Sequence, residues 1–337
     1  MNAPLGQAPP MKAWQVNGYG EPRDVLELVQ VGRPRPGPGQ LLVRVLAAAG
    51  NFPDALMCLG TYQVKPPLPF TPGVELCGEV LEAGEGVAGF AAGDRVIGGA
   101  ALPHGGFAEY ALMRAAAAFP VPGDLDDAEA APFHLTYQTG WFGLHRRAAL
   151  KAGETLLVHA AAGGVGSGAV QLGKAAGARV IGVAGGPQKA AVATALGADV
   201  VIDRDAEDFV AVVKEVTGGR GADVVYDPVG GDAFRKSTKC VAFEGRIIVV
   251  GFASGDIPQA ALNHALVKNY SILGLHWGLY ERMDPGSIRD CHAELARLVE
   301  AGLIRPLISE RLTLADVPDG VSRLAAGSTT GRIVFQP

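Results

Sequence analysis

TLLVHAAAGGVGSGAVQLGKAAG, which runs from Thr155 to Gly177, is the stretch that decides the fold. Its apolar run Leu156–Val158 predicts a strand buried inside a parallel sheet. The small residues from Ala160 to Gly166 predict a tight turn, and the segment from Ser167 to Ala176 predicts a helix behind that turn. The stretch therefore has the order strand, glycine-rich turn and helix, which is typical of one unit of an α/β sheet.

The glycines of this turn indicate a binding site for a dinucleotide. Gly164 and Gly166 have the G-x-G spacing, and a third small residue, Ala169, lets the helix pack closely on the strand. Bare backbone amides at Gly163, Gly164, Val165 and Gly166 can approach a diphosphate at the helix N-terminus without an intervening side chain. The alternative is a glycine-rich crossover that binds nothing, and the α/β pattern around the turn argues against it.

The region around this stretch predicts a doubly wound parallel sheet. Strand-like apolar runs alternate with helical segments such as Glu207 to Val216, which has apolar residues along one face and Gly218 as its stop. Alternation of this kind is typical of a parallel sheet covered by helices on both faces, and six strands make a complete dinucleotide-binding domain. The expected strands are Leu156–Val158, Val180–Val183, Val200–Ile202, Val224–Tyr226, Ile247–Val250 and Ile272–Leu275.

The chain on either side predicts a second, β-rich domain. From Lys12 to about Pro132, short apolar runs are broken by Gly and Pro, which is typical of a small barrel-like domain with one helix starting near Pro53. The closing segment Arg332–Phe335 reads as one more strand, which has no place in the nucleotide sheet. We therefore expect residues 1–133 to form the first part of a catalytic domain, 134–279 the nucleotide-binding domain and 280–337 a return to the first domain.

Composition excludes several classes of function. The chain of 337 residues has a formal net charge of −5, which gives no general attraction for nucleic acid or membranes. Its four cysteines are scattered, without a C-x-x-C pair, which favours a reducing compartment and no zinc knuckle. The sequence has no apolar run long enough for a membrane span and no signal-like start, so a cytoplasmic location without membrane partners is expected.

The residues after the second strand predict NADPH as the cofactor. An NAD-preferring site has an acid about twenty residues beyond the glycine turn, and this chain has none there. Gly185 instead leaves space, Lys189 lies in the first turn of the next helix, and Arg204 follows the third strand. A 2′-phosphate would meet positive charge at that place. Lys189 and Arg204 are alternatively solvated surface residues.

Several motifs resemble one known family. VHAAAGGVG at Val158–Gly166, NFPD at Asn51–Asp54, PLPFTPGVE at Pro67–Glu75 and GDRV at Gly93–Val96 are similar to those of the medium-chain dehydrogenase/reductase superfamily, specifically its zeta-crystallin-like quinone oxidoreductase branch. The resemblance extends from about Lys12 to the end of the chain. It implies a GroES-like β-barrel domain with a Rossmann domain inserted near its C-terminal end. It also implies NADPH, no metal, and a homodimer or homotetramer built through the Rossmann domains.

The resemblance also bears on zinc. The alcohol dehydrogenases of this superfamily hold a catalytic zinc with a Cys where this chain has Asn51 and a His where it has Val74. A carboxamide is a poor zinc ligand and valine has no donor. Without a Lewis acid, alcohol oxidation is disfavoured, and an acceptor that takes hydride readily is expected.

Five further site residues are assigned by resemblance. Thr139 matches a threonine beside the nicotinamide, Phe252 lies in a segment near its carboxamide, and Arg332 is placed like a residue that reaches the cofactor phosphates. Asn51 and Tyr62 match the polar lining of the family's active-site cleft, where they can hydrogen-bond the acceptor's carbonyl oxygen; the proton comes from Tyr62 or from solvent. Thr139 is alternatively an ordinary helix residue, Asn51 a helix cap and Tyr62 a core residue.

Three functions remain open at this point. The leading hypothesis is a zinc-independent, NADPH-dependent oxidoreductase that transfers hydride to a quinone. The alternative is a reductase of activated C=C bonds in enones, enals or enoyl thioesters, in which the small-molecule acceptor is a conjugated carbonyl compound. The further alternative is an NADPH-binding protein with a non-enzymatic structural or RNA-associated role, which the net negative charge disfavours with respect to RNA.

Overall fold

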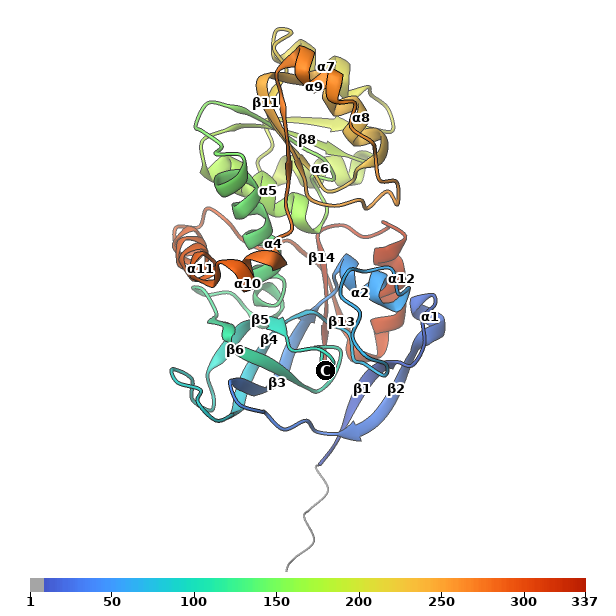
Figure 1. Cartoon of the computed structure of the whole chain (residues 1–337), viewed down its shortest axis with the longest axis vertical. Helices are drawn as coiled ribbons and strands as arrows, with labels where there is room; N and C mark the ends of the chain where they lie inside the picture. The colour runs from blue at the N-terminus through green and yellow to red at the C-terminus, as the bar shows by residue number, and fades with distance from the viewer. Residues whose placement is uncertain (1–8) are drawn as a thin grey trace, which may run out of the picture. The chain divides into compact units, whose positions relative to one another are not determined.

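A computed structural model describes residues 9–337, which divide into two compact units. The first unit contains the residues up to Leu135 together with Pro306–Pro337, and the second contains Thr136–Arg305. The chain therefore leaves the first unit, builds the second and returns (Figure 1). Within residues 9–337, no helix is both long enough and apolar enough to cross a bilayer.

The first unit is built mainly from strands. Its elements before the second unit are β1 (Pro10–Val16), α1 (Pro22–Val25), β2 (Leu26–Gly32), β3 (Gln40–Ala49), α2 (Phe52–Cys58), β4 (Glu75–Ala83), β5 (Arg95–Ala100), β6 (Tyr110–Pro120) and α3 (Asp127–Ala130). Those after it are β13 (Ile308–Thr313), the 3₁₀ helix η2 (Leu314–Asp316), α12 (Val317–Ala325) and β14 (Arg332–Gln336).

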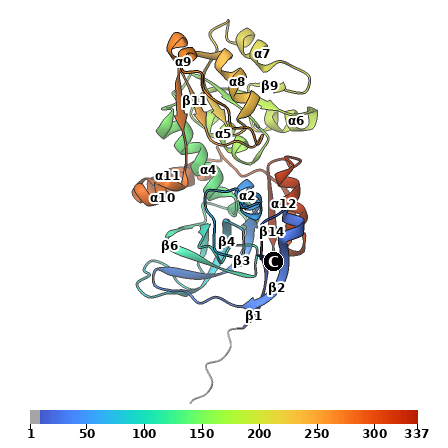
Figure 2. The ribbon, with the colours of Figure 1, turned by 45° about the vertical axis from the view of Figure 1, so that its right-hand side comes forward.

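The main sheet of this unit closes on itself. Its strand order is β13-β14-β3-β4-β5-β6, and an additional antiparallel pairing of β3 with β6 completes the barrel (Figure 2). The strand predicted at Arg332–Phe335 is β14, which pairs antiparallel with β3 through Val334 and Ala49. Phe335 is buried and meets Phe107 edge to face, with ring centroids 5.2 Å apart, so the returning segment belongs to the barrel's own core.

The second unit is an α/β layer structure. Its elements are α4 (Phe133–Trp141), which begins in the first unit, then the π-helix η1 (Phe142–Arg147), β7 (Thr155–Val158), α5 (Gly164–Ala175), β8 (Arg179–Ala184), α6 (Pro187–Ala195), β9 (Val200–Asp203), α7 (Phe209–Val216), β10 (Ala222–Asp227), α8 (Gly231–Cys240), β11 (Val241–Val249), α9 (Leu262–Lys268), β12 (Ser271–Gly274), α10 (Gly278–Met283) and α11 (Pro285–Glu300).

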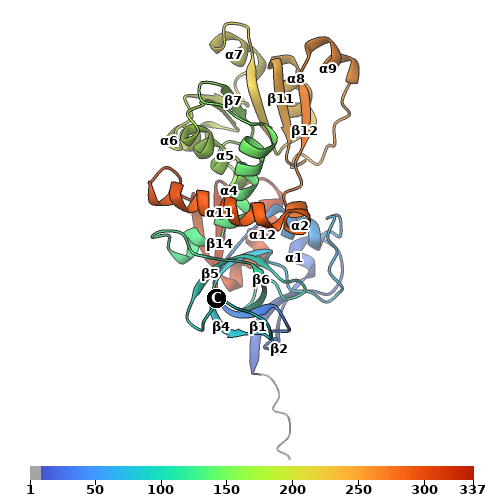
Figure 3. The ribbon, with the colours of Figure 1, turned by 60° about the vertical axis from the view of Figure 1, so that its left-hand side comes forward.

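The six strands of this unit, all predicted, form one parallel sheet in the order β12-β11-β10-β7-β8-β9. Figure 3 shows β11 and β12, which are neighbours at one end of this order. This order is that of a complete dinucleotide-binding fold, and it reverses between β7 and β10. Ligands of such sheets bind at the carboxyl ends of the strands where the order reverses. The glycine turn follows the carboxyl end of β7 and therefore lies at that point.

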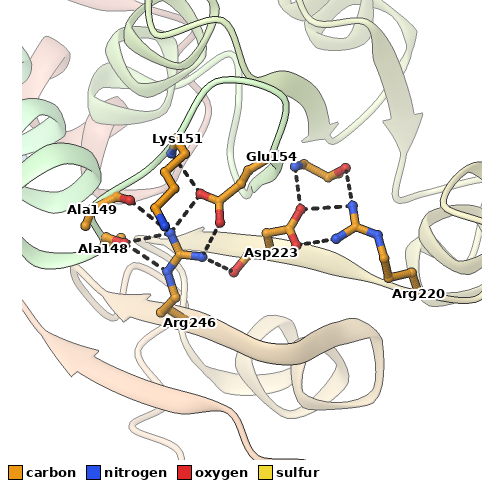
Figure 4. A network of polar contacts seen from close by, with 8 residues as sticks. Ala148, Ala149, Lys151, Glu154, Arg220, Asp223 and Arg246 are labelled. Atoms are coloured by element: carbon orange, nitrogen blue, oxygen red, sulfur yellow. Dashed lines mark hydrogen bonds and ion pairs between the residues drawn. The ribbon is translucent and has the colours of Figure 1, made fainter.

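A polar network fixes the amino ends of three strands (Figure 4). Arg246 of β11 donates to both carboxylate oxygens of Glu154, at 2.8 and 2.9 Å, and to the carbonyl oxygen of Ala148 at 2.9 and 2.6 Å. Asp223 of β10 accepts the backbone N–H of Thr155, the first residue of β7, at 2.7 Å. These contacts connect β7, β10 and β11 at their amino ends, which lie away from the glycine turn.

The division between the units differs from the expected return at residue 280. Helix α11 belongs to the second unit, because its residues Ile288, Cys291 and Leu295 are buried and the side chain of Gln138 donates to the carbonyl oxygen of Ile288 at 3.2 Å. The first crossing, after Leu135, lies close to the expected position. Residues 1–8 of the expected first segment lie outside the described residues.

Candidate functional site

The glycine turn is tighter than the sequence predicts, because α5 begins at Gly164 rather than at Ser167. Gly163 is the N-cap residue, with φ −89° and ψ 179°, and as a glycine it has no side chain to cap the helix. Gly164, Val165 and Gly166 thus form the first turn of the helix, where backbone N–H groups have no intrahelical acceptor. The predicted diphosphate-binding residues occupy the positively polarised end of α5.

Gly166 is the position at which a side chain is excluded. A Cβ atom there would lie 2.0 Å from the carbonyl oxygen of Ala160, far inside any real contact. Ala160 itself has a positive φ of 50°, so the backbone doubles back sharply after β7. The glycine therefore allows the helix to pack closely against the turn. This packing places the backbone N–H groups at the carboxyl ends of the strands.

This end of α5 fits a diphosphate on two grounds. The first turn offers backbone donors that no N-cap side chain occupies within the described residues. The helix dipole adds a partial positive charge of about half an elementary charge at the same place. A carboxylate cap at Gly163 would have competed with an anionic ligand, and none is present.

The carboxyl ends of β8 and β9 hold the residues predicted to meet a 2′-phosphate. Gly185 lies directly against Arg204, because a Cβ atom at Gly185 would lie 2.9 Å from Arg204 Nε. Gly186 has φ 78°, and its N–H donates to Asp203 Oδ1 at 2.8 Å, which fixes the turn. Lys189 lies in the first turn of α6. The exposed guanidinium of Arg204 also lies 3.6 Å from Asp205 Oδ1, so part of its charge is compensated.

Thr139 is positioned by the packing of α4 on α5. A Cβ atom at Gly140 would lie 2.7 Å from Leu172 Cδ1, and one at Gly168 would lie 3.0 Å from Thr136 Cγ2. Small residues on both helices thus permit the close contact. Thr139 is largely buried, and its position depends directly on the helix that carries the glycine turn.

Phe252 lies in the loop that follows β11, and this loop is held against the end of β10. Ala253 N donates to Pro228 O at 3.1 Å, and a Cβ atom at Gly230 would lie 2.8 Å from Phe252 Cδ1. Phe252 is about one-third exposed, at 37%. The loop therefore places an aromatic ring at the carboxyl ends of the strands, where the glycine turn also lies.

In the first unit, the structure brings Asn51 and Arg332 together around a buried acid, Glu75. Arg332 Nη2 donates to Asn51 Oδ1 at 2.6 Å and to Glu75 Oε2 at 2.9 Å. Asn51 Nδ2 lies 3.2 Å from both Glu75 Oε2 and the carbonyl oxygen of Ala49. The second oxygen of Glu75 accepts the N–H of Leu135 at 2.5 Å. All three side chains are buried, and Arg332 Nε has no partner among the described residues.

A second buried acid, Asp54, lies beside this cluster. Its carboxylate accepts three backbone N–H groups, from Asn51 at 2.9 Å, Gly73 at 2.9 Å and Val74 at 3.1 Å. Burial raises the pKa of Asp54 to about 6, and burial likewise raises the pKa of Glu75 to about 7 despite the neighbouring Arg332 guanidinium. Both acids belong to motifs quoted above, NFPD and PLPFTPGVE, but nothing in their spacing reveals that they meet.

Tyr62 is half-buried and packs against the barrel core. Burial raises the pKa of its phenol, and the negative charge of Asp54 raises it further. A phenol is protonated at neutral pH in any case, and the raised pKa makes this hydroxyl group a hydrogen-bond donor that releases its proton even less readily.

The structure changes how Arg332 is understood. The resemblance assigns it to the cofactor phosphates, whereas its Nη2 atom is engaged by Asn51 and Glu75 and the residue is 6% exposed. In the structure Arg332 lies inside the barrel, where it joins β14 to the N-cap residue of α2 and to the start of β4. The phosphate contact stays a prediction.

The donor set around Asn51 does not fit a zinc ion. The Asn51 oxygen already accepts from Arg332, Val74 has no donor atom, and both oxygens of Glu75 accept hydrogen bonds. Zinc in proteins is held by thiolates, imidazoles or carboxylates in tetrahedral geometry. Across residues 9–337, no three His, Cys, Asp or Glu side chains are grouped so that they could hold a metal ion.

Comparison with known proteins matches two separate stretches of the chain to family models. Residues 37–123 match the family model for the alcohol dehydrogenase GroES-like domain, and residues 164–293 match that for zinc-binding dehydrogenase. The chain is 40% identical over 301 residues to the quinone oxidoreductase-like protein 2 homolog of Nematostella vectensis, covering 89% of this chain and 82% of the relative. It is also 32% identical over 313 residues to phthioceranic/hydroxyphthioceranic acid synthase of Mycobacterium tuberculosis, covering 92% of this chain but 14% of the synthase.

Solved structures extend this likeness over almost the whole chain. The Escherichia coli quinone oxidoreductase complexed with NADPH is similar with a TM-score of 0.89 and 31% identity, covering 97% of this chain and 100% of that chain. A mycobacterial protein, also complexed with NADPH, has a TM-score of 0.90 and 33% identity, covering 97% and 100% of the two chains. Both identities are high enough for the likeness to concern the family as well as the fold.

Proposed function

Because the chain belongs to the quinone oxidoreductase-like branch of the medium-chain dehydrogenase/reductase superfamily, we propose that it is a zinc-independent reductase that transfers hydride from NADPH to a quinone. The observation that carries the proposal is the first turn of α5, where bare backbone donors follow Gly163 at the switch point of the sheet. The two NADPH complexes of similar structures support the choice of cofactor.

NADPH, when bound, supplies the hydride. The residues of the second unit bind and orient it: the N-terminus of α5 receives the diphosphate, and Gly185 with Arg204 and Lys189 receives the 2′-phosphate. Thr139 and Phe252 lie on segments packed against the same nucleotide-binding layer and are proposed to border the nicotinamide. Holding the reactants in place is the main contribution of such residues, because it replaces an encounter in solution by a fixed geometry.

On the acceptor side, Tyr62 is the better candidate for a donor to the carbonyl oxygen. A phenol is protonated at neutral pH, and the raised pKa of Tyr62 makes its proton harder to release, so the hydroxyl can donate a hydrogen bond to the developing negative charge without losing the proton. Both contacts of the Asn51 amide nitrogen go to protein oxygens, which leaves it less available to an acceptor. We propose that Asn51 stabilises the barrel through its contacts with Glu75 and Arg332 and that solvent supplies the proton.

The proposal of zinc independence rests on the chemistry of the donor set. A zinc ion would need to displace Arg332 from Asn51 and Glu75 and would still lack a thiolate or imidazole at Val74. Elemental analysis of the purified protein, together with turnover after dialysis against a chelator, tests this. Stoichiometric zinc, or activity that is lost with the chelator and restored by zinc, would contradict it.

A second candidate function is favoured by one of the relatives. Because 92% of this chain is similar to a segment of an acid synthase, we propose as the alternative the reduction of an activated C=C bond, such as that of an enoyl thioester, which would use the same hydride donor. The test is NADPH oxidation measured with a panel of quinones and with a panel of enones, enals and enoyl thioesters. A kcat/KM at least tenfold higher on the quinones supports the first function, and the reverse supports the second. Tight NADPH binding without turnover on either panel would indicate the non-enzymatic role.

We also propose that the protein is a homodimer or homotetramer through its second unit. Strand β12 is an edge of the parallel sheet, and the adjoining helix α9 exposes Leu262 and Leu266, each at 76%. An unpaired edge next to apolar side chains is a surface that a second copy can cover. Sedimentation velocity of the wild type and of Leu266→Glu tests this, with Leu28→Glu on β2 as the control. A monomeric wild type would contradict it.

A reducing, cytoplasmic location is proposed on the basis of the cysteines. Cys58, Cys77, Cys240 and Cys291 are all free and buried. Burial raises the pKa of Cys58 and of Cys77 to about 12, so these thiols are unreactive. The location would be checked by fractionation of cells that express the protein at its natural level.

A further inference from the structure

The second unit has a cavity at the amino ends of its strands, which is the end of the sheet opposite to the glycine turn. Its volume is about 400 Å³, within the range of small-molecule sites. Gly221 and Cys240 line it, and these residues immediately precede β10 and β11, so the cavity lies at the amino ends of those strands. Helices α7, α8 and α9 lie together at this end of the unit (Figures 1 and 3).

Positive charge dominates the lining of this cavity. Lys214, Arg220, Lys239 and Lys268 line it, and no carboxylate does. Arg220 is compensated by Asp223, to which it is hydrogen-bonded at 3.0 Å (Figure 4). Lys268 Nζ donates to the carbonyl oxygen of Thr238 at 2.8 Å. Among the described residues, Lys214 and Lys239 have no ion-pair or hydrogen-bond partner for their ammonium groups. Two uncompensated charges thus converge on one cavity, in a chain whose net charge is −5.

Two of the lysines that line the cavity, Lys214 and Lys268, carry like charges. Burial lowers the pKa of the Lys268 ammonium group, and the positive charge of Lys214 lowers it further. An anion placed between these lysines would relieve this repulsion.

The helix dipoles account for the lysines but not for the whole lining of the cavity. Lys214, Lys239 and Lys268 lie in the last turns of α7, α8 and α9, where a cation offsets the helix dipole. That explains one lysine on each helix. It does not explain Phe243, an apolar side chain that lines the same cavity at 69% exposure and lies on β11, outside the helix α9 proposed above to contact a second copy. Together the cations and this aromatic side chain match a ligand with an anionic end and an aromatic or aliphatic part.

We propose that this cavity binds an organic phosphate, with the phosphoryl group on Lys214 and Lys239 and the apolar part on Phe243. A phosphate monoester carries close to two negative charges at neutral pH, which equals the two uncompensated lysines. Lysine is a common partner of phosphate. The proposed site is separate from the nucleotide site, because one lies at the amino ends and the other at the carboxyl ends of the strands of one sheet. The proposal therefore does not depend on the proposed function.

The test is a titration with phenyl phosphate followed by amide NMR. Gly219 and Gly221 report on the cavity, whereas Gly163 and Gly166 report on the glycine turn, so binding at either site is recognised separately. We expect shifts at Gly219 and Gly221, with an affinity at least several-fold higher than that for inorganic phosphate because of the ring. The double variant Lys214→Gln/Lys239→Gln is expected to weaken binding roughly tenfold or more, the loss typical of a charge-assisted hydrogen bond. Lys236→Gln, which removes a lysine of α8 outside the lining, is the matched control.

Three outcomes would overturn the proposal. Phenyl phosphate could shift only the signals of Gly163 and Gly166, or none. The double variant could bind as tightly as the Lys236→Gln control. Inorganic phosphate could bind as tightly as phenyl phosphate, which would show that Phe243 contributes nothing. The lysines are surface side chains, so both variants are expected to fold, and their thermal unfolding curves check this.

Discussion

Glu75 and Glu154 are both held by an arginine, yet their pKa values move in opposite directions. Glu75 is 1% exposed, so the cost of burying its charge outweighs the attraction of Arg332 and its pKa rises. Glu154 lies nearer to solvent, and the hydrogen bonds from Arg246 lower its pKa. An arginine partner therefore does not by itself determine how a carboxylate affects stability, because the degree of burial decides which effect is larger.

The first prediction concerns the pH dependence of stability through Glu75. Its pKa is raised from 4.5 to about 7 in the folded protein, so the folded state binds the proton more tightly than the unfolded state does. The stability that this contributes is fully present below about pH 4.5 and is lost as the pH rises through about 7. In Glu75→Gln this loss is expected to disappear, while the similar contribution of Asp54 below about pH 6 remains.

Urea unfolding at a series of pH values measures this effect. Glu79→Gln is the matched control, because Glu79 lies on the same strand but pairs with Arg44 at the surface. A Glu75→Gln variant with the same slope of unfolding free energy against pH as this control would contradict the prediction.

At the scale of elements, Arg246 connects three strands. Its guanidinium is hydrogen-bonded to Glu154, Ala148 O and Asp223 O, and its side chain is 16% exposed. Arg246→Met should lower the free energy of unfolding by about 1.5–3 kcal/mol, the range for hydrogen bonds to a charged group. The variant should also lose the part of stability that Glu154 contributes above its usual pKa and loses as the pH falls.

The control for this prediction is Arg235→Met. Arg235 pairs with Asp232 and Asp256 on the surface, so its loss should cost less than about 1 kcal/mol. Chemical denaturation of both variants at two pH values, near 7 and near 4, gives the comparison. Equal losses in the two variants would show that the network adds nothing beyond surface ion pairs.

Gly166 provides a second prediction at the scale of elements. Gly166→Ala places a methyl group 2.0 Å from the carbonyl oxygen of Ala160, so α5 must shift away from the turn. We expect a loss of about 1–3 kcal/mol in stability, as for other overpacked sites. We also expect at least tenfold weaker NADPH binding by fluorescence titration, because the backbone donors move with the helix. Gly278→Ala, where the nearest atom is 3.7 Å away, is the control and should change neither quantity.

At the scale of the whole molecule, β14 is the part on which the first unit depends. Removing residues 332–337 takes away the buried side chains of Ile333, Val334 and Phe335 and leaves Glu75 without Arg332. We expect the first unit to unfold while the second, with its own sheet and core, persists. Limited trypsin digestion followed by mass spectrometry should then yield a resistant fragment close to residues 136–305. A chain that ends after Phe335 should resist digestion as the full chain does.

The sequence predicts the layers of the molecule well because their signals are local. Each strand of the nucleotide sheet is a short apolar run, and Gly164 and Gly166 identify the turn without any knowledge of distant residues. The limits of elements are less predictable: α5 starts at Gly164 because a glycine can enter a helix when packing requires it. The π-helix at Phe142–Arg147 gives no periodic signal of its own.

The candidate site is predictable only where its residues are neighbours in sequence. Asn51, Glu75 and Arg332 are drawn from three distant strands or their ends, and only folding brings them together. The cavity lined by Lys214, Lys239 and Lys268 is hidden for the same reason, since its lysines end three different helices. Whether a charge is compensated depends on contacts between residues that are distant in the sequence, and the sequence alone does not reveal these contacts.

The position of β14 has a consequence for synthesis on the ribosome. Residue 332 is translated almost two hundred residues after residue 135. At about 5–20 residues per second, β14 is therefore synthesised roughly 10–40 s after the first part of the barrel. The nucleotide sheet is contiguous, and it can complete itself during that interval. The part of β3 that β14 later pairs with is exposed during this interval, so we expect a chaperone to bind the nascent chain most strongly then.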